Sequence, residues 1–378
     1  MQLTPALAWL VDEAAAVSGA ERFLSRLGER LIADGMPLAA GALTQAAPHP
    51  IIARRVWLWR ADTGEVIEAL GFGSLAGAPT EPSNVGRDWL AAFGSGIVET
   101  EVAGAPLVGD AADRPGLGWA VSRSLTDAEA GILHDVARLA AAPLGVLAAR
   151  SALATLLETY LGRRSAAQVL AGRLGREGGE TIRAVLLTAD LRGFTALSEA
   201  SSPDAVVAAL DAWFDRVAGA VHAFGGEVLK FIGDGVLAIF PIGDRSAPEA
   251  CESALRAVAA ARAGMAHLDR QRAEQGLPAL PFGMALHVGE MRWGNIGTAD
   301  RLDFTAIGSA VNLVSRLEGL CRTLGHTVLA SGTFAAEVGT PMISLGEHRL
   351  RGIADPCEVF GLPDGSSVSA SRAPAPRT

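Results

Sequence analysis

Two aspartates stand out because each follows an apolar stretch. Asp190 ends the run IRAVLLTAD, and Asp234 lies between two glycines at the tip of VLKFIGDGVLAIF. An aspartate in such a turn is usually only a turn residue. If the first run is a strand beside the hairpin, however, the two carboxylates meet at one rim of a sheet, where they repel and shift each other's pKa. A divalent cation relieves that repulsion, and oxygen ligands with room for phosphate oxygens suit Mg²⁺ or Mn²⁺.

The segment after Asp190 has the composition of an anion cradle. It reads Leu191-Arg192-Gly193-Phe194-Thr195 and leads into a helix. A glycine-bearing turn at a helix start points backbone N–H groups outward, which favours phosphate binding. We therefore expect Gly193, Phe194 and Thr195 to contact a triphosphate.

A third group of candidates follows the pair Gly308-Ser309. Asn312 and Arg316 are four residues apart in a helical segment, so they share one face and can reach one ligand. Arg316 suits negative charge that builds up on a phosphate during nucleophilic attack. Such a pair on a helix is usually just solvated, and only its coincidence with the other motifs favours a function.

The motifs ADLRGFT, KFIGDG and DFTAIGSAVNLVSR occur in this order, and together they resemble the class III nucleotidyl cyclases. The resemblance covers essentially the whole second half of the chain. It implies two metal ions per site, Mg²⁺ or Mn²⁺, held by Asp190, Asp234 and the carbonyl of Leu191. It also implies that Lys230 reads the purine and that Asn312 and Arg316 steady the ribose and the transition state. A late basic residue is expected at the terminal phosphates, and we favour Arg351 over Arg349.

One position departs from the commonest adenylyl cyclase pattern. Many of these enzymes carry aspartate seven residues before the asparagine, where this chain has Thr305. Threonine there resembles the subgroup called class IIIb, some members of which respond to bicarbonate; that response stays open here. Asp303 lies two residues away and keeps the same face in a strand, so a shared purine-reading role also stays open.

The purine can be argued from hydrogen-bonding groups. Adenine offers an acceptor at N1 and a donor at N6, which suit the ammonium of Lys230 and the hydroxyl of Thr305. Guanine offers donors at N1 and N2, and each donor left unpaired costs about 1–3 kcal/mol. ATP is therefore favoured over GTP as the substrate.

The family's catalytic centre forms between two cyclase domains, and this chain carries one such domain. The resemblance therefore implies a homodimer with two equivalent sites, in which Asp234 faces one site and Lys230 the other. Two alternatives remain: a guanylyl cyclase, and a catalytically silent cyclase-fold module that dimerises or senses nucleotides. A diguanylate cyclase is disfavoured because the hairpin lacks the paired acids of that family.

The motifs require an α+β fold of ferredoxin-like βαββαβ order over residues 181–363. We expect the first strand and the hairpin at the centre of the sheet. Expected strands cover 182–191, the two arms of the hairpin, 282–291, 326–331, 341–352 and 357–362. Expected helices cover about 206–224, 247–275 and the segment after residue 309. Residues 364–378 are predicted to be disordered from their composition.

Residues 1–145 are predicted to form a smaller mixed α/β regulatory domain. Helices are expected at 3–17 and 20–33, strands at 51–61 and 116–124, loop and short helix over 74–115, and a long helix from about Thr126, with Thr126 or Asp127 as its cap. The pattern resembles a GAF-type sensory domain with an unknown ligand or signal. A packing or dimerisation unit without a ligand is the alternative. Residues 146–180 are predicted to be a helical connector, either a signal-transmitting element or a spacer.

The composition of the chain argues against several classes of protein. The chain has 378 residues, enough for two domains, and its net charge of −9 without a basic tract argues against nucleic acid as a partner. Three cysteines without metal spacing favour a reducing, cytoplasmic setting. The N-terminus does not resemble a signal peptide. The apolar stretch 133–157 is interrupted by Arg138, Pro143 and Arg150, so we expect no membrane span.

Overall fold

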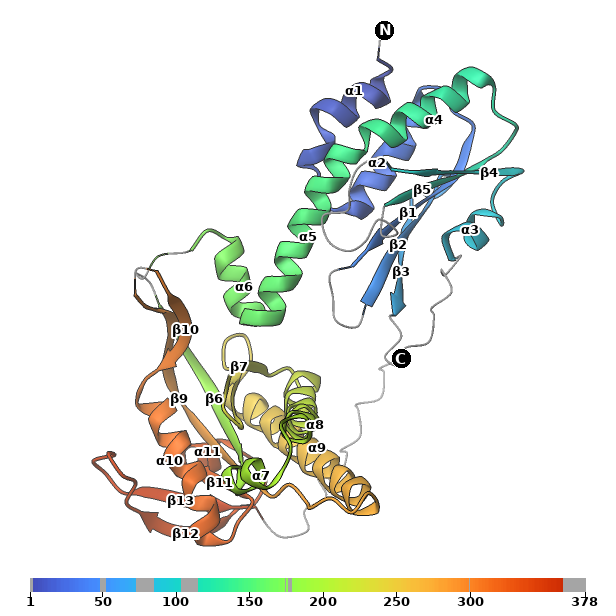
Figure 1. The fold of residues 1–378 in the computed structure, drawn as a ribbon. Coiled ribbons are helices and arrows are strands. Elements are labelled where there is room, and N and C mark those ends of the chain that lie inside the picture. Colours follow the sequence, from blue (N-terminus) through green and yellow to red (C-terminus); the bar gives the residue numbers. More distant parts are fainter. Residues whose placement is uncertain are drawn as a thin grey trace, which may run out of the picture. The chain divides into compact units, whose positions relative to one another are not determined.

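The computed structural model describes residues 3–47, 52–72, 85–102, 115–173, 175, 179–298 and 300–362. The chain divides into two compact units, Met1–Ala171 and Gly172–Thr378 (Figure 1). The division falls inside the predicted connector 146–180. The predicted tail 364–378 and parts of the predicted loop 74–115 lie outside the described residues. The domain boundaries drawn from the sequence therefore stay predictions.

The first unit is built on a five-stranded antiparallel sheet in the order β3-β2-β1-β5-β4. Its strands are β1 (Leu38–Ala46), β2 (Ile52–Arg60), β3 (Val66–Phe72), β4 (Gly96–Glu101) and β5 (Gly116–Val121). Its helices are α1 (Pro5–Asp12), α2 (Ala20–Ala33), α3 (Val85–Leu90), α4 (Asp127–Leu139), α5 (Ala141–Leu161) and α6 (Arg163–Leu170), with a short 3-10 turn at Ala14–Ala16.

Three strands of this unit, β1, β3 and β4, were not expected. The sequence of β1, LAAGALTQA, is poor in the β-branched and aromatic residues that favour strands. It is nevertheless a strand because it pairs on both sides, with β2 and with β5. Gly41 is needed there, since a Cβ would lie only 2.7 Å from the ring of Trp119. Tertiary pairing thus overrides a weak local preference.

The start of α4 was expected near Thr126. The Thr126 hydroxyl accepts a hydrogen bond from the backbone N–H of Glu129, and the Glu129 carboxylate accepts one from the backbone N–H of Thr126. This reciprocal pair is a capping box. Because the carboxylate also bonds Arg123, the pKa of Glu129 is lowered to about 2. Thr126 is therefore the cap.

The helical stretch Asp127–Leu161 is long and apolar enough to cross a membrane, judged by length and composition alone. Leu133, Val136 and Leu144 are buried in the core of the first unit, but only 28% of the apolar window is buried. Large apolar side chains of α5 are exposed at Val146, Leu153, Leu156, Tyr160 and Leu161, and the first four are spaced seven, three and four residues apart. The absence of a membrane span stays a prediction.

The second unit is built on an eight-stranded mixed sheet in the order β12-β13-β11-β9-β6-β8-β7, with β10 paired to β9. Its strands are β6 (Glu180–Leu191), β7 (Glu227–Ile232), β8 (Gly235–Pro241), β9 (Phe282–Gly297), β10 (Leu302–Ile307), β11 (Val328–Ser331), β12 (Ile343–His348) and β13 (Cys357–Gly361). Its helices are α7 (Phe194–Ala200), α8 (Pro203–Ala223), α9 (Ala247–Glu274), α10 (Ser309–Leu324) and α11 (Gly332–Glu337). The four strands β9-β6-β8-β7 with α8 and α9 have the predicted βαββαβ order.

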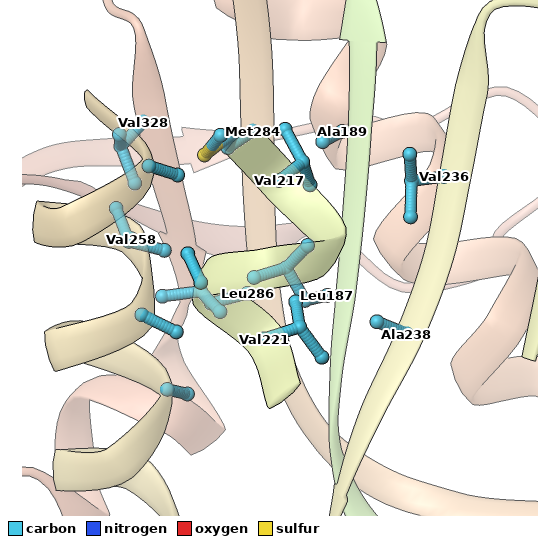
Figure 2. Close-up of a cluster of buried hydrophobic side chains, with 14 of the residues drawn as sticks. Leu187, Ala189, Val217, Val221, Val236, Ala238, Val258, Met284, Leu286 and Val328 are labelled. Carbon is cyan, nitrogen blue, oxygen red and sulfur yellow. The ribbon is translucent and has the colours of Figure 1, made fainter. Parts of the chain in front are cut away.

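The two faces of this sheet differ in chemistry. On one face, alternate residues of β6 and β8 pack under α8 and α9, among them Leu187, Ala189, Val236 and Ala238 (Figure 2). We call this the apolar face. The intervening residues, including Asp190, lie on the opposite face, which α10 covers; we call this the α10 face.

Two features of the second unit differ from expectation. The hairpin does not lie wholly at the centre, because β8 pairs with β6 but β7 is the edge strand. In addition, β9 continues to Gly297 and forms an antiparallel arm with β10. The arm was missed because glycine and charged residues interrupt its apolar pattern. Buried Trp293 and Phe304, whose rings stack with centroids 6.1 Å apart, hold the arm together.

Candidate active site

The structure brings Asp190 and Asp234 together at one rim of the sheet, as the spacing predicted. Asp190 is near the end of β6, and Asp234 is in the tight turn that joins β7 to β8. The turn approaches closely: a Cβ on Gly235 would lie 3.1 Å from Oδ1 of Asp190. Partial burial, the negative charges of Asp234 and Glu318, and a hydrogen bond with Asp234 together raise the pKa of Asp190 to about 7. The site therefore has an excess of negative charge that a cation would relieve.

Glu318 is a third acid at this site, and the sequence reasoning missed it. Asp190 pairs in register with Gly283, and the carboxylate of Glu318 on α10 occupies the space that a side chain at Gly283 would fill. Burial raises the pKa of Glu318, while the positive charge of Arg192 acts in the opposite direction. The available signal was an acid directly beside the apolar positions of α10, where a wholly solvated acid is unusual.

Backbone contacts fix the two loops that carry these acids. After Asp190, the N–H of Arg192 donates to the carbonyl of Pro281 at 2.7 Å, and its guanidinium donates to the carbonyl of His326 at 2.5 Å. On the other loop, Nε1–H of buried Trp213 donates to the carbonyl of Asp234 at 2.8 Å. Both chain turns are thus held independently of any ligand.

The predicted anion cradle follows directly. Gly193 has a φ of +74°, in the left-handed region that favours glycine, and precedes α7. Phe194 packs against the apolar core, whereas Thr195 is exposed. Leu191 is buried at the end of β6, opposite Phe282. The contacts of these residues with a phosphate or a metal ion stay predictions.

The donor set at this rim fits Mg²⁺ or Mn²⁺. Two carboxylates share the rim, and hard oxygen ligands are those these cations prefer. Within the described residues, no three His, Cys, Asp or Glu side chains are arranged to hold a metal ion. Phosphate oxygens or water would therefore have to complete the coordination. Asp190, Asp234 and the carbonyl of Leu191 would be the protein's share.

Helix α10 carries candidate site residues on two opposite sides. Glu318 points inward over Gly283, whereas Asn312 and Arg316 are exposed. Arg316 precedes Glu318 by two residues, which is about 200° around a helix, so the two side chains leave in nearly opposite directions. Asn312 and Arg316 share a face, as predicted, but that face is turned away from Asp190 of the same chain.

Lys230 and Asp234 lie on one hairpin but have different neighbours. The Lys230 ammonium forms an ion pair with Asp303, which lies on β10 of the arm. Thr305 is two residues further along β10 and partly buried. The sequence left open whether Asp303 shares a role with Thr305, and the structure shows that Asp303 holds the lysine.

Two late arginines and a buried histidine remain, and the phosphate-binding role of the arginines stays a prediction. Arg349 and Arg351 are exposed between β12 and β13. His287 is buried in β9, where its Nδ1 lies 2.8 Å from Oγ of Ser331 and 3.0 Å from Oγ1 of Thr333. Burial lowers the pKa of His287 to about 4, so it is neutral near pH 7 and suits a packing role.

Comparison with known proteins agrees with this geometry. Residues 180–333 match the family described as the adenylate and guanylate cyclase catalytic domain. The second unit therefore contains a class III nucleotidyl cyclase catalytic domain, and the first unit is an additional domain N-terminal to it.

The named relatives are adenylate cyclases. "Adenylate cyclase 1" of Rhizobium meliloti is 37% identical over 151 residues, which are 39% of this chain and 22% of that protein. "Adenylate cyclase" of Anabaena cylindrica is 31% identical over 165 residues, 43% of this chain and 32% of that protein. The chain thus spans about a fifth to a third of the length of these two relatives.

Among solved structures, the adenylyl cyclase CyaB from P. aeruginosa matches with a TM-score of 0.45 and 27% identity. The match covers 50% of this chain and 98% of that one. The assignment of the catalytic domain rests on the sequence match over residues 180–333.

Proposed function

We propose that this protein is an adenylyl cyclase that converts ATP to 3′,5′-cyclic AMP and pyrophosphate. The observation that carries the proposal is the pairing of Asp190 with Asp234, whose mutual repulsion a bound divalent cation would relieve. Two divalent cations there would polarise the α-phosphate and lower the pKa of the ribose 3′-hydroxyl. The adenylate cyclases among the relatives support the same activity.

The protein's own residues bind the nucleotide and stabilise the transition state. The glycine turn at Gly193 offers backbone N–H groups to the triphosphate. Arg316 supplies positive charge where negative charge grows at the α-phosphate, and Asn312 holds the ribose. Arg351 is assigned to the terminal phosphates. Lys230 donates to N1 of adenine, and Thr305 accepts from its amino group.

The site is completed by a second copy of the chain. Glu318 points toward Asp190 of its own chain, so Arg316 on the other side of α10 is directed elsewhere. A nucleotide bound at Asp190 and Asp234 of one copy would meet Lys230, Asn312 and Arg316 of another. A two-fold symmetric homodimer contains two such sites.

The substrate test uses purified full-length protein with Mn²⁺ and either ATP or GTP, with cyclic products separated by chromatography. Cyclic AMP should form with a higher kcat/KM than cyclic GMP. Lys230→Glu should reduce the use of ATP sharply while the folded signal in circular dichroism is kept. Faster turnover of GTP by the wild type would refute the purine assignment, and no product from either nucleotide would refute the cyclase itself.

We further propose that the first unit regulates the second through α5. Four of its exposed apolar residues are spaced seven, three and four residues apart, which suits pairing with the same helix of a second copy. A chain that begins near Glu180 keeps the site residues but should differ from the full chain in basal activity or in dimer affinity. Equal activity and equal dimerisation would reduce the first unit to a spacer or a localisation module.

A further inference from the structure

The ion pair between Lys230 and Asp303 joins two segments that are far apart in the sequence. Lys230 is on the edge strand β7, and Asp303 is on the arm strand β10. The two side chains keep 35% and 61% of their surface exposed. An ion pair this exposed contributes little to folding stability. Fold stability therefore does not explain this ion pair, and we ask instead what the position of the two side chains achieves.

A bulge sets the direction of Lys230. The pairing of β7 with β8 runs from Val228 opposite Ala238 to Lys230 opposite Leu237, so Leu229 is an extra residue. Ala238 belongs to the apolar face, and the next position on β8, Leu237, belongs to the α10 face. With regular pairing, the Lys230 side chain would point to the apolar face. The bulge instead turns it to the face that carries Asp190.

An aromatic contact sets the direction of Asp303. Phe304 is buried and its ring stacks on that of Trp293 in β9. Asp303 and Thr305 flank Phe304, so both leave β10 on the opposite side. Two separate devices, the bulge and the buried ring, thus aim an ammonium and a carboxylate at each other.

We propose that Asp303 is a positioning residue that holds the Lys230 ammonium where it recognises adenine. The inference rests on the proposed function, since it assigns Asp303 a part in the selectivity of the same site. An ammonium has three donors, and a carboxylate that accepts one of them orients the other two. Lysine otherwise samples many rotamers, and ordering such a side chain on binding costs free energy. Thr305 is then free to accept from the adenine amino group.

Removing the carboxylate should weaken recognition and leave the chemical step intact. In Asp303→Asn the amide keeps the shape but loses the charge. The KM for ATP should rise about three- to tenfold and kcat should stay within about twofold, because the lost order affects binding. The preference for ATP over GTP should shrink by a similar factor. Asp300→Asn is the matched control: it removes an exposed acid from the same arm, and its only described side-chain bond is to Thr298.

A double-mutant cycle separates positioning through Lys230 from any other role. Dissociation constants for 3′-deoxy-ATP and 3′-deoxy-GTP, which cannot cyclise, are measured with Mn²⁺ on full-length wild type, Lys230→Met, Asp303→Asn and the double variant. We expect Asp303→Asn to weaken 3′-deoxy-ATP binding three- to tenfold alone and to have no further effect beside Lys230→Met. An equal loss in both backgrounds, or no loss in the wild type, overturns the inference.

Two further measurements, the melting temperature and the cyclase activity of the wild type, distinguish failure of the Asp303 role from failure of the proposed function. The melting temperature of Asp303→Asn should stay within about 2 °C of wild type, since an exposed pair adds little stability; a fall of several degrees would make Asp303 a structural residue and overturn the inference. If the wild type forms no cyclic nucleotide but the binding cycle is non-additive, the proposed function fails and the role of Asp303 stands. If cyclic AMP forms and the cycle is additive, only the role of Asp303 fails.

Discussion

The two faces of the catalytic sheet are built from alternate residues of the same strands, yet only one of them carries the charged groups of the site. Leu187 and Ala189 of β6 are fully buried on the apolar face under α8 and α9. Asp190, the next residue, lies on the α10 face, where burial and like charges raise its pKa to about 7. His287 and Glu318, whose pKa values are also shifted chiefly by burial, lie on that same face. The apolar face stabilises the fold, whereas the α10 face buries apolar side chains such as Leu186 and Val314 and also holds charge at a cost to stability.

The largest expected effect comes from Asp190→Asn. Without the carboxylate, cyclisation should fall by a factor of about 10³ or more, because a metal ligand and its charge are lost. The metal-free protein should unfold at a higher temperature than wild type near pH 8, because like-charge repulsion is removed. Initial rates with Mn²⁺ and melting curves with a chelator measure the two effects. A variant that is inactive and also less stable would mean that Asp190 stabilises the fold.

Leu187→Ala tests the apolar face three residues away in the same strand. Truncating this fully buried side chain should lower the free energy of unfolding by about 2–5 kcal/mol. Activity per folded molecule, measured well below the melting temperature, should stay within about twofold. Urea unfolding followed by circular dichroism gives the first quantity and active-site titration the second. A large loss of kcat in fully folded protein would show that the two faces are not separate in function.

Trp213→Phe tests a hydrogen bond by which the apolar face supports the site. The change removes the 2.8 Å hydrogen bond to the carbonyl of Asp234. We expect a loss of about 1–2 kcal/mol in unfolding free energy and a three- to tenfold weaker affinity for Mn²⁺ in calorimetry. Trp59→Phe is the control, because buried Nε1 of Trp59 has no protein partner. Unchanged Mn²⁺ affinity in Trp213→Phe would mean that the turn is fixed by other contacts.

The last test is the pH dependence of the metal-free protein. The pKa of Asp190 is raised from 3.8 to about 7, so the native state binds more protons than the unfolded state in that range. Its contribution to stability is therefore present at low pH and lost as pH rises toward 7. His287, with a lowered pKa, acts in the opposite sense below about pH 6.5. The difference in melting temperature between wild type and Asp190→Asn, followed across this pH range, isolates the aspartate.

The sequence allowed a good prediction of the second unit and a poorer one of the first. Periodic apolar residues and motifs at fixed spacing predicted β6, the hairpin, α8, α9 and α10. The pairing of Asp190 with Asp234 followed from topology alone. In the first unit, β1 is a strand only because two neighbours pair with it, and its alanine-rich sequence does not indicate this.

Three parts of the site were missed, for physical reasons. The partner of Lys230 depends on a bulge at Leu229 and on the arm that carries Asp303, and neither leaves a local signal. Glu318 reaches Asp190 only because Gly283 leaves room for it. Trp213 contributes through a backbone carbonyl of a residue far along the chain. Long-range packing, which a single sequence does not display, determines all three.

The central claim is that one site takes its metal ligands from one copy and its transition-state residues from another. Asp190→Ala and Arg316→Ala homodimers should each be nearly inactive, because both of their sites carry the lesion. Co-expression of the two variants with different tags allows heterodimers to be purified and verified. Each heterodimer has one intact site and one doubly damaged site, so it should recover about half of wild-type activity, or about a quarter in an unsorted random mixture. Verified heterodimers as inactive as the parent variants would contradict a site shared between two copies.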